Sequence, residues 1–252
     1  MTVDKNDIRA GLQELGIMSG DLLLVHSSLR SFGYVQGGAN TVIDALLETV
    51  GDSGTVLAPT LTFSVLKSLP HRFSVKESPS SSGLITETFR QRKNALRSRH
   101  PVSSAAAIGP DAAYLTADHR DTPCGPDSPY FRLYELGGKV LFFGASLGSN
   151  TVFHCAEEIA RPAYLGFATI EDAVVVDADG RSRTVTARRY DCFDRGITRY
   201  LRNMEPVFRE RGLLKRTTIG ESRTFVINAR ENVDVSCETL TTNPDYILSP
   251  RS

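Results

Sequence analysis

The chain has 252 residues, of which 40% are hydrophobic and 23% are charged, and its formal net charge at pH 7 is zero. This is the composition of an ordinary globular protein. The length is near the upper limit for one hydrophobic core, so we expect a single domain over residues 1–252. No apolar run approaches the ~18 residues of a membrane span, and the first residues lack the pattern of a signal peptide. Both features favour a cytoplasmic protein that makes no membrane contact.

The cysteines and histidines do not follow the spacing of a metal site. The four cysteines lie at least thirty residues apart, and the chain has no CxxC pair, HExxH segment or DxDxDG loop. We therefore expect reduced structural thiols and no bound metal ion.

Charge is unevenly distributed along the chain. Residues 181–230 contain twelve Arg and one Lys against two Asp and three Glu. This excess predicts either a solvated basic face or a region that attracts phosphate groups. Because the segment contains no recognisable nucleic-acid module, small phosphorylated ligands are favoured over nucleic acid.

The first part of the chain alternates between helical and strand patterns. Residues 6–15 have apolar side chains at helical spacing, with Asn6 or Asp7 as the expected cap. Residues 21–26 and 54–61 are short apolar runs typical of buried strands, and a loop and a helix at 39–51 separate them. The order strand, loop, helix, strand predicts a βαβ-type unit within an α/β sheet.

The remaining chain continues this pattern after a long irregular stretch. Residues 64–83 are rich in Ser and Pro and lack periodicity, which predicts a long flexible loop. No repeat or linker divides the chain. We expect helices at 84–92, 111–119, 130–138, 151–160 and 193–211, a buried strand at 139–146, strands within 171–189 that turn at Asp179–Gly180, and a final strand and helix.

The segment GASLG, residues 144–148, matches the GxSxG turn that exposes the nucleophile of many hydrolases. In that arrangement a histidine must follow both the nucleophile and the acid along the chain. The only histidine after Ser146 is His154, eight residues later and in the same helical region. We therefore interpret the segment as a tight turn between strand and helix, and keep a serine hydrolase as a remote alternative.

The stretch SNTVFHCAEE, residues 149–158, predicts a helix capped by its first serine or asparagine. Thr151, His154 and either Glu157 or Glu158 are three or four residues apart and so share a helical face. The positive end of the helix dipole favours a neutral imidazole, which a general base requires. A structural histidine beside solvated acids is the alternative that spacing alone leaves open.

Two further segments carry polar side chains that could meet a ligand. HSSLRSFG, residues 26–33, lies between a strand and a helix, where hydroxyl and backbone N–H groups can bind phosphate. It matches neither of the common phosphate-binding glycine motifs. RSRHPVSS, residues 97–104, places His100 before a proline, and such a histidine is by itself more often structural than catalytic.

Taken together, HSSLRSFG, HPVSS and NTVFHCAEE occur in an order that resembles the aminoglycoside 3-N-acetyltransferase family. The resemblance covers most of the chain, and no segment typical of the unrelated GNAT acetyltransferases is present. It implies a single α/β domain with a central mixed β-sheet flanked by helices. It also implies direct acyl transfer from acetyl-CoA to an amine of an amino sugar, by default the 3-amino group of an aminoglycoside antibiotic.

The same resemblance assigns roles to individual residues. His154 would be the general base, Glu157 the acid that orients it or holds the substrate amine, and Thr151 the hydroxyl that stabilises the oxyanion. Coenzyme A would be received by a loop and glycine pair, with two further residues at the cleft wall: Ser28, Ser31, Phe32, Gly33, Gly37, Gly38, His100 and Ser104.

The acceptor is less well defined. Glu158, Asp191 and Asp194 are the candidate contacts for substrate ammonium groups, but an aminoglycoside is a polycation and the surrounding segment is rich in Arg. The alternative acceptor is a dTDP- or UDP-linked amino sugar, although the arginines could instead bind the 3′-phosphate of coenzyme A. A binding protein without activity is a remote alternative. The sequence leaves the oligomeric state open, including a homodimer.

Overall fold

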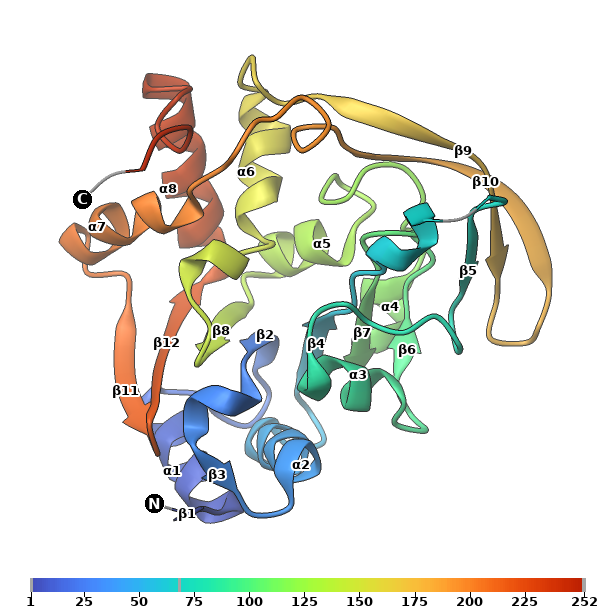
Figure 1. Ribbon diagram of the computed structural model, residues 1–252. Coiled ribbons are helices and arrows are strands. Elements are labelled where there is room, and N and C mark those ends of the chain that lie inside the picture. The colour runs from blue at the N-terminus through green and yellow to red at the C-terminus, as the bar shows by residue number, and fades with distance from the viewer. Residues whose placement is uncertain (1, 68, 251–252) are drawn as a thin grey trace.

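The computed structural model describes residues 2–67 and 69–250, in which a mixed β-sheet is covered by helices on both faces (Figure 1). The strands are β1 Thr2–Val3, β2 Leu22–Ser27, β3 Tyr34–Val35, β4 Thr55–Pro59, β5 Arg72–Ser74, β6 Leu96–Arg97, β7 Ala105–Ile108, β8 Lys139–Phe143, β9 Phe167–Val176, β10 Ser182–Tyr190, β11 Lys215–Ile219 and β12 Ser222–Asn228. The helices are α1 Lys5–Glu14, α2 Gly38–Val50, α3 Leu84–Arg90, α4 Ala112–Thr116, α5 Pro129–Leu136, α6 Phe153–Ala160, α7 Met204–Glu210 and α8 Ala229–Thr242. Short 3₁₀ helices are η1 Leu29–Phe32, η2 Phe63–Lys67, η3 Leu147–Ser149 and η4 Leu201–Asn203.

The main sheet has seven strands in the order β11-β12-β8-β2-β4-β7-β6. The strand β2 is parallel to both β4 and β8, and the other pairs are antiparallel. The expected α/β fold with a central mixed sheet is therefore confirmed. Because the three parallel strands end at one edge, the loops after them meet there, which is where α/β proteins usually bind ligands.

The strands of the sheet centre are apolar on both faces. Leu23 and Val25 of β2 belong to the core beneath α1 and α2, whereas Leu24 belongs to the core beneath α5, α6 and α8. Successive side chains of a strand point to opposite faces, so a strand covered on both sides reads as a continuous apolar run. This explains why 21–26 and 54–61 could be recognised as strands.

A second sheet lies beside the first. The strands β9 and β10 form an antiparallel hairpin, and β5 pairs with β9 in parallel, giving the order β10-β9-β5. Figure 1 shows this hairpin reaching from the top of α6 across to β5. The predicted turn at Asp179–Gly180 is confirmed, and β9 begins earlier than expected, at Phe167.

Two predicted helix starts are wrong. The cap of α1 is Asp4, which accepts hydrogen bonds from the N–H groups of Asn6 and Asp7. The helix α6 begins at Phe153 and not at 151, because η3 and a turn occupy the preceding residues. Asn150 still accepts a hydrogen bond from the Phe153 N–H at 3.3 Å.

The helix expected over 193–211 is also wrong. Gly196 has a φ of +68°, which lies outside helical geometry, and the chain from 193 to 200 forms turns and irregular structure. Only η4 and α7 are helical here, and Pro206 is tolerated in the first turn of α7, where its missing N–H has no partner to lose. The segment that was expected to form one long helix instead wraps around the end of α6.

The stretch 64–83 is partly regular. It contains most of η2 and all of β5, while Ser68 lies outside the described residues. The short strands β6 and β7 were not expected, because Ala105–Ile108 is too short and alanine-rich to show a strand pattern. Within the described part of the chain, no helix is long and apolar enough to cross a membrane.

Candidate active site

The start of α6 lies at the edge where β2, β4 and β8 end, and His154 is in its first turn. Two cavities adjoin this histidine. The larger, of about 660 Å³, is called here the aromatic cavity, and its walls include Phe63, Leu66, Val102, Arg189, Tyr190 and Phe193. The smaller, of about 270 Å³, is called the serine cavity, and its walls include Ser27, Ser81, Ser82, Thr86 and Ser149. Leu61, Thr151 and His154 line both cavities.

His154 and Glu157 form a hydrogen-bonded pair. The His154 Nδ1 lies 2.5 Å from Glu157 Oε2, so a neutral ring donates its Nδ1 proton to the carboxylate. This leaves Nε2 as the proton acceptor of the ring. Spacing left Glu157 and Glu158 open as partners of His154, and the structure pairs His154 with Glu157, the acid that the family resemblance implied.

Glu157 is fully buried and receives two more hydrogen bonds. Tyr164 Oη donates to Oε1 at 2.8 Å, and Arg199 Nη1 donates to Oε2 at 2.9 Å. Burial alone would raise the pKa of Glu157, but His154 and Arg199 outweigh it and hold that pKa below its ordinary value. Glu157 is therefore a carboxylate near neutral pH, able to stabilise a positive charge on His154.

Sequence reasoning missed Arg199 and Tyr164. Arg199 lies 42 residues beyond Glu157, and only the turns after β10 bring the two side chains together. Its guanidinium also lies over the Tyr190 ring, 5.1 Å from the centroid, and the Tyr190 ring is 5.2 Å from that of His154. No local pattern in the chain marks these long-range partners.

Thr151 is positioned by a histidine from the neighbouring strand. Its backbone N–H donates to His26 Nε2 at 3.3 Å, and its side chain lines both cavities. Burial and the nearby His154 lower the pKa of His26 to about 3. His26 is thus a neutral hydrogen-bond acceptor, a role that its place in HSSLRSFG did not reveal.

The predicted coenzyme A loop comes directly after Ser27 in the sequence, but its residues are not among those that line the serine cavity. Ser31 Oγ donates to Ser28 O at 2.7 Å and lies 3.1 Å from Ser222 Oγ. Phe32 is completely buried and packs edge-on against Phe143, so its side chain belongs to the core and cannot contact a cofactor. Gly33, Gly37 and Gly38 all have positive φ; the exposed Gly37 caps α2, and the half-buried Gly38 is its first residue.

His100 and Ser104 are internal structural groups and do not form a cleft wall. His100 Nδ1 accepts from the N–H groups of Val102 and Ser103, and burial lowers the pKa of His100 to about 4. Ser104 Oγ donates to Thr60 O at 2.8 Å and is fully buried. Neither side chain lines the two cavities at His154, so the geometry does not support the predicted cofactor contact of these two residues.

The three predicted acceptor contacts lie in different places. Glu158 lines a separate cavity and is held by protein donors. Asp191 pairs with Arg195 at 2.9 Å and is not among the residues that line the aromatic cavity. Only Asp194 lines that cavity, where it pairs with Arg189 at 2.7 Å.

The Ser146 hydroxyl has no histidine partner among the described residues. It accepts from Gly148 N at 3.3 Å and from Arg202 Nε at 3.1 Å, and it caps η3. The serine therefore organises the turn before α6, and the hydrolase alternative lacks its base.

The basic segment 181–230 is largely neutralised by ion pairs. Acids from inside and outside the segment pair with eight of its thirteen basic residues. The pairs are Arg181 with Asp179, Arg183 with Asp177, Arg188 with Asp121, Arg189 with Asp194, Arg195 with Asp191, Arg199 with Glu157, Arg211 with Glu238 and Arg216 with Glu205.

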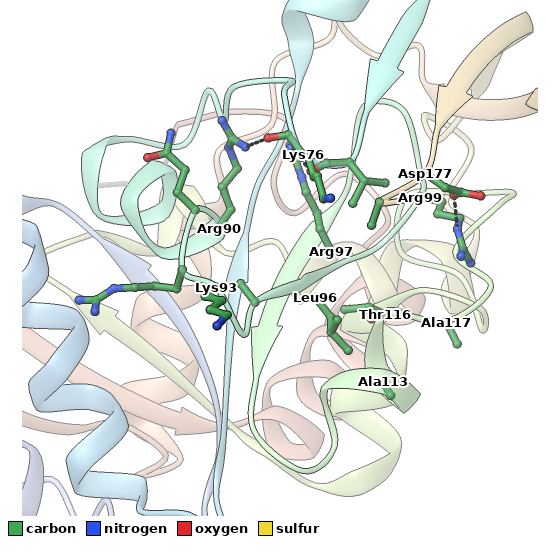
Figure 2. Close-up of a pocket in the computed structure, with 15 residues that line it drawn as sticks. Lys76, Arg90, Lys93, Leu96, Arg97, Arg99, Ala113, Thr116, Ala117 and Asp177 are labelled. Carbon is green, nitrogen blue, oxygen red and sulfur yellow. Dashed lines mark hydrogen bonds and ion pairs between the residues drawn. The ribbon is translucent and has the colours of Figure 1, made fainter. Parts of the chain in front are cut away.

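A third pocket, of about 570 Å³, lies at the far end of α3 and is rich in basic side chains (Figure 2). It shares no lining residue with the two cavities at His154. Arg90 donates to Glu87, Arg99 pairs with Asp177, and the buried Arg97 donates to Ser78 O and Thr60 O. These guanidinium groups bind protein acceptors, and the pocket is separate from the two cavities at His154.

The comparisons with known proteins agree with this geometry. A family model described as aminoglycoside 3-N-acetyltransferase matches residues 24–241. Aminoglycoside N(3)-acetyltransferase VII of Streptomyces paromomycinus is 33% identical over 264 residues, covering 92% of this chain and 89% of the relative. The chain therefore belongs to the aminoglycoside 3-N-acetyltransferase family.

Two solved structures have the same fold. The structure of AAC-IIIb in binary complex with CoASH has a TM-score of 0.85 and 26% identity, and the match covers 100% of each chain. The structure of AAC-VIa bound to sisomicin has a TM-score of 0.84 and 29% identity, covering 96% of this chain and 98% of that one. The relatives match the interpretation as an N-acetyltransferase and not the nucleotide-sugar or hydrolase alternatives.

Proposed function

We propose that this protein transfers an acetyl group from acetyl-CoA to an amino group of an amino sugar, by family default the 3-amino group of an aminoglycoside antibiotic. The observation that carries the proposal is the place of His154, which is oriented by Glu157 and lies on the wall of two cavities at once. A base shared by two cavities can meet two substrates together. Transfer would then be direct, without an acyl-enzyme.

The serine cavity suits the thioester end of acetyl-CoA. Its hydroxyl groups can donate to the amide oxygens of the pantetheine arm. Ser27 leads into the loop at Ser28–Gly33, and the start of α2 at Gly37 and Gly38 offers exposed backbone N–H groups for the pyrophosphate. The relative AAC-IIIb has been solved with CoASH, which supports this assignment. The aromatic cavity is then left for the amine.

The residues at the boundary can perform the transfer. The sugar ammonium group must first lose a proton to become a neutral amine. As the amine nitrogen bonds to the thioester carbon, it loses a second proton, which His154 Nε2 accepts. The C–S bond breaks, and His154 returns its proton to the leaving sulfur, giving the free thiol. Glu157 stabilises the transient imidazolium, and the Thr151 hydroxyl donates to the carbonyl oxygen as charge develops there.

The proposed reaction converts an ammonium group into a neutral amide. An aminoglycoside would lose one positive charge, which is the physical basis of a role in antibiotic resistance. Because acetyl-CoA is used in the cytoplasm, we place the reaction there.

The proposal is tested by following thiol release from acetyl-CoA with sisomicin, gentamicin and a UDP-linked amino sugar as acceptors. We expect release with the aminoglycosides, and His154→Ala should lower kcat by about 10³-fold because general base catalysis is lost. Coenzyme A binding, measured by calorimetry, should persist in that variant. Release with the UDP-sugar alone, or full turnover by His154→Ala, would contradict the proposal.

A further inference from the structure

We propose that Arg189 determines acceptor specificity by occupying Asp194, so that the aromatic cavity favours amines with few positive charges. The inference rests on the proposed function, since it takes the aromatic cavity as the acceptor site. Among the described residues that line this cavity, Asp194 is the one with a carboxylate. Arg189 holds it at 2.7 Å.

The charged groups around the cavity are already paired with one another. Two guanidinium groups, those of Arg189 and Arg199, line it together with His154. Glu157 lies behind His154, is fully buried, and already receives three hydrogen bonds. Arg189 is paired with Asp194 and Arg199 with Glu157, so an acceptor with many ammonium groups finds no unpaired carboxylate among the described residues that line the cavity.

The walls of the cavity are otherwise suited to uncharged surface. Phe63, Leu66, Val102 and Phe193 line it, and Phe193 is 92% exposed. Apolar and aromatic groups of this kind pack against the C–H faces of a sugar ring, and this contact does not depend on a charge on the sugar. The cavity thus offers contact area for an amino sugar but little compensation for extra ammonium groups.

The ion pair between Arg189 and Asp194 acts as an internal competitor. The two side chains are partly exposed, at 26% and 45%, so the pair is weak enough to be displaced. A substrate ammonium group gains the Asp194 carboxylate only by displacing Arg189, which would then remain nearby as an unpaired cation. Removing the guanidinium frees the carboxylate and lowers the positive charge of the cavity together.

The experiment measures KM for glucosamine, 2-deoxystreptamine and sisomicin, which carry increasing numbers of amino groups. In Arg189→Met, we expect the ratio of the sisomicin KM to the glucosamine KM to fall about tenfold, which is the size of one charge interaction at a protein surface. In Arg189→Lys the ratio should stay within about twofold, because the charge remains. The matched control is Arg183→Met on the same strand, whose partner Asp177 lies outside the cavity.

An unchanged ratio in Arg189→Met, or an equal fall in Arg183→Met, would overturn the inference. Sisomicin binding to His154→Ala with and without Arg189→Met gives the same test in the absence of turnover. We expect about tenfold tighter binding without the guanidinium, and equal affinities would again overturn the inference. By contrast, absence of thiol release with every amine would overturn the proposed function, so the two failures can be told apart.

Discussion

Glu157 and Glu158 are neighbours in sequence, and each carboxylate accepts three hydrogen bonds, yet the two serve different ends. Glu157 is bound by His154, Arg199 and Tyr164, and the first two of these can carry a positive charge. Glu158 is bound by Thr122 Oγ1, Cys124 N and Tyr190 Oη, all neutral donors from the structure around it. One carboxylate is arranged to stabilise a changing charge, and the other holds two segments of chain against α6.

The difference shows why spacing could not choose between the two acids. In a helix, positions three and four residues after His154 both lie on its side. The choice depends on what faces each acid from elsewhere in the fold, and those groups come from residues 122 to 124, 164, 190 and 199. The chemistry is therefore set by tertiary neighbours and not by the helix itself.

The sharpest way to break this comparison is to replace each acid by its amide. Glu157→Gln should lower kcat by about 10²-fold to 10³-fold, because His154 loses both its orientation and the charge that stabilises its protonated form. Glu158→Gln should change kcat by less than about threefold while lowering the free energy of unfolding by about 1–3 kcal/mol, since one donor is left unsatisfied. Steady-state kinetics and urea unfolding of both variants measure the two effects. Comparable kcat losses would show that both acids are catalytic.

The histidines differ in the same way as the two acids, and the pH dependence of the unfolding free energy measures this difference. His154 lies at the cavities, whereas His26 and His100 are buried, and burial lowers their pKa values to about 3 and about 4. In the unfolded chain a histidine has a pKa near 6.5, so the unfolded state binds protons first as the pH falls. The stability contributed by neutral His26 and His100 is complete above that value. It is lost progressively as the pH falls toward 4 for His100 and toward 3 for His26.

Between pH 7 and pH 5, each of these two histidines should cost about 2 kcal/mol of unfolding free energy. Urea unfolding followed by circular dichroism at the two pH values tests this. His100→Gln should reduce this loss by about 2 kcal/mol and leave the share of His26 in place, even though that variant is less stable at pH 7. A flat profile in the parent protein would show that the buried histidines are hydrated.

Much of the fold could be predicted because its strands are buried on both faces. The runs at 21–26, 54–61 and 139–146 were recognised, and β2, β4 and β8 form the centre of the sheet. The segment 193–211 failed because its apolar spacing looked helical, while Gly196 and the packing around α6 impose turns. Local patterns overestimate a helix wherever tertiary contacts determine the path of the chain.

The residues of the site also fall into those that the sequence could predict and those that it could not. His154, Glu157 and Thr151 lie within seven residues and could be proposed from spacing and family resemblance. Arg199, which orients Glu157, lies in another segment and carried no local signal, whereas His26 lies in HSSLRSFG, whose pattern suggested phosphate binding and not contact with Thr151. Only the folded chain shows that one fixes the acid and the other fixes the backbone of Thr151.

The finest test of the comparison removes one tyrosine hydroxyl that donates to each carboxylate and leaves both aromatic rings in place. Tyr164→Phe deletes the donor to Glu157 Oε1 at 2.8 Å, and Tyr190→Phe deletes the donor to Glu158 Oε1 at 2.7 Å. The Tyr164 hydrogen bond helps to keep the pKa of Glu157 low, so its loss raises that pKa. We expect activity to be lost in acid at a higher pH in Tyr164→Phe, with kcat at neutral pH reduced only about threefold. Tyr190→Phe should leave the acid limb of the profile in place, because its lost hydroxyl served the carboxylate that holds structure. Equal shifts of the acid limb in the two variants would contradict this separation. They would show that the Tyr190 hydroxyl affects the acid limb as much as the Tyr164 hydroxyl does.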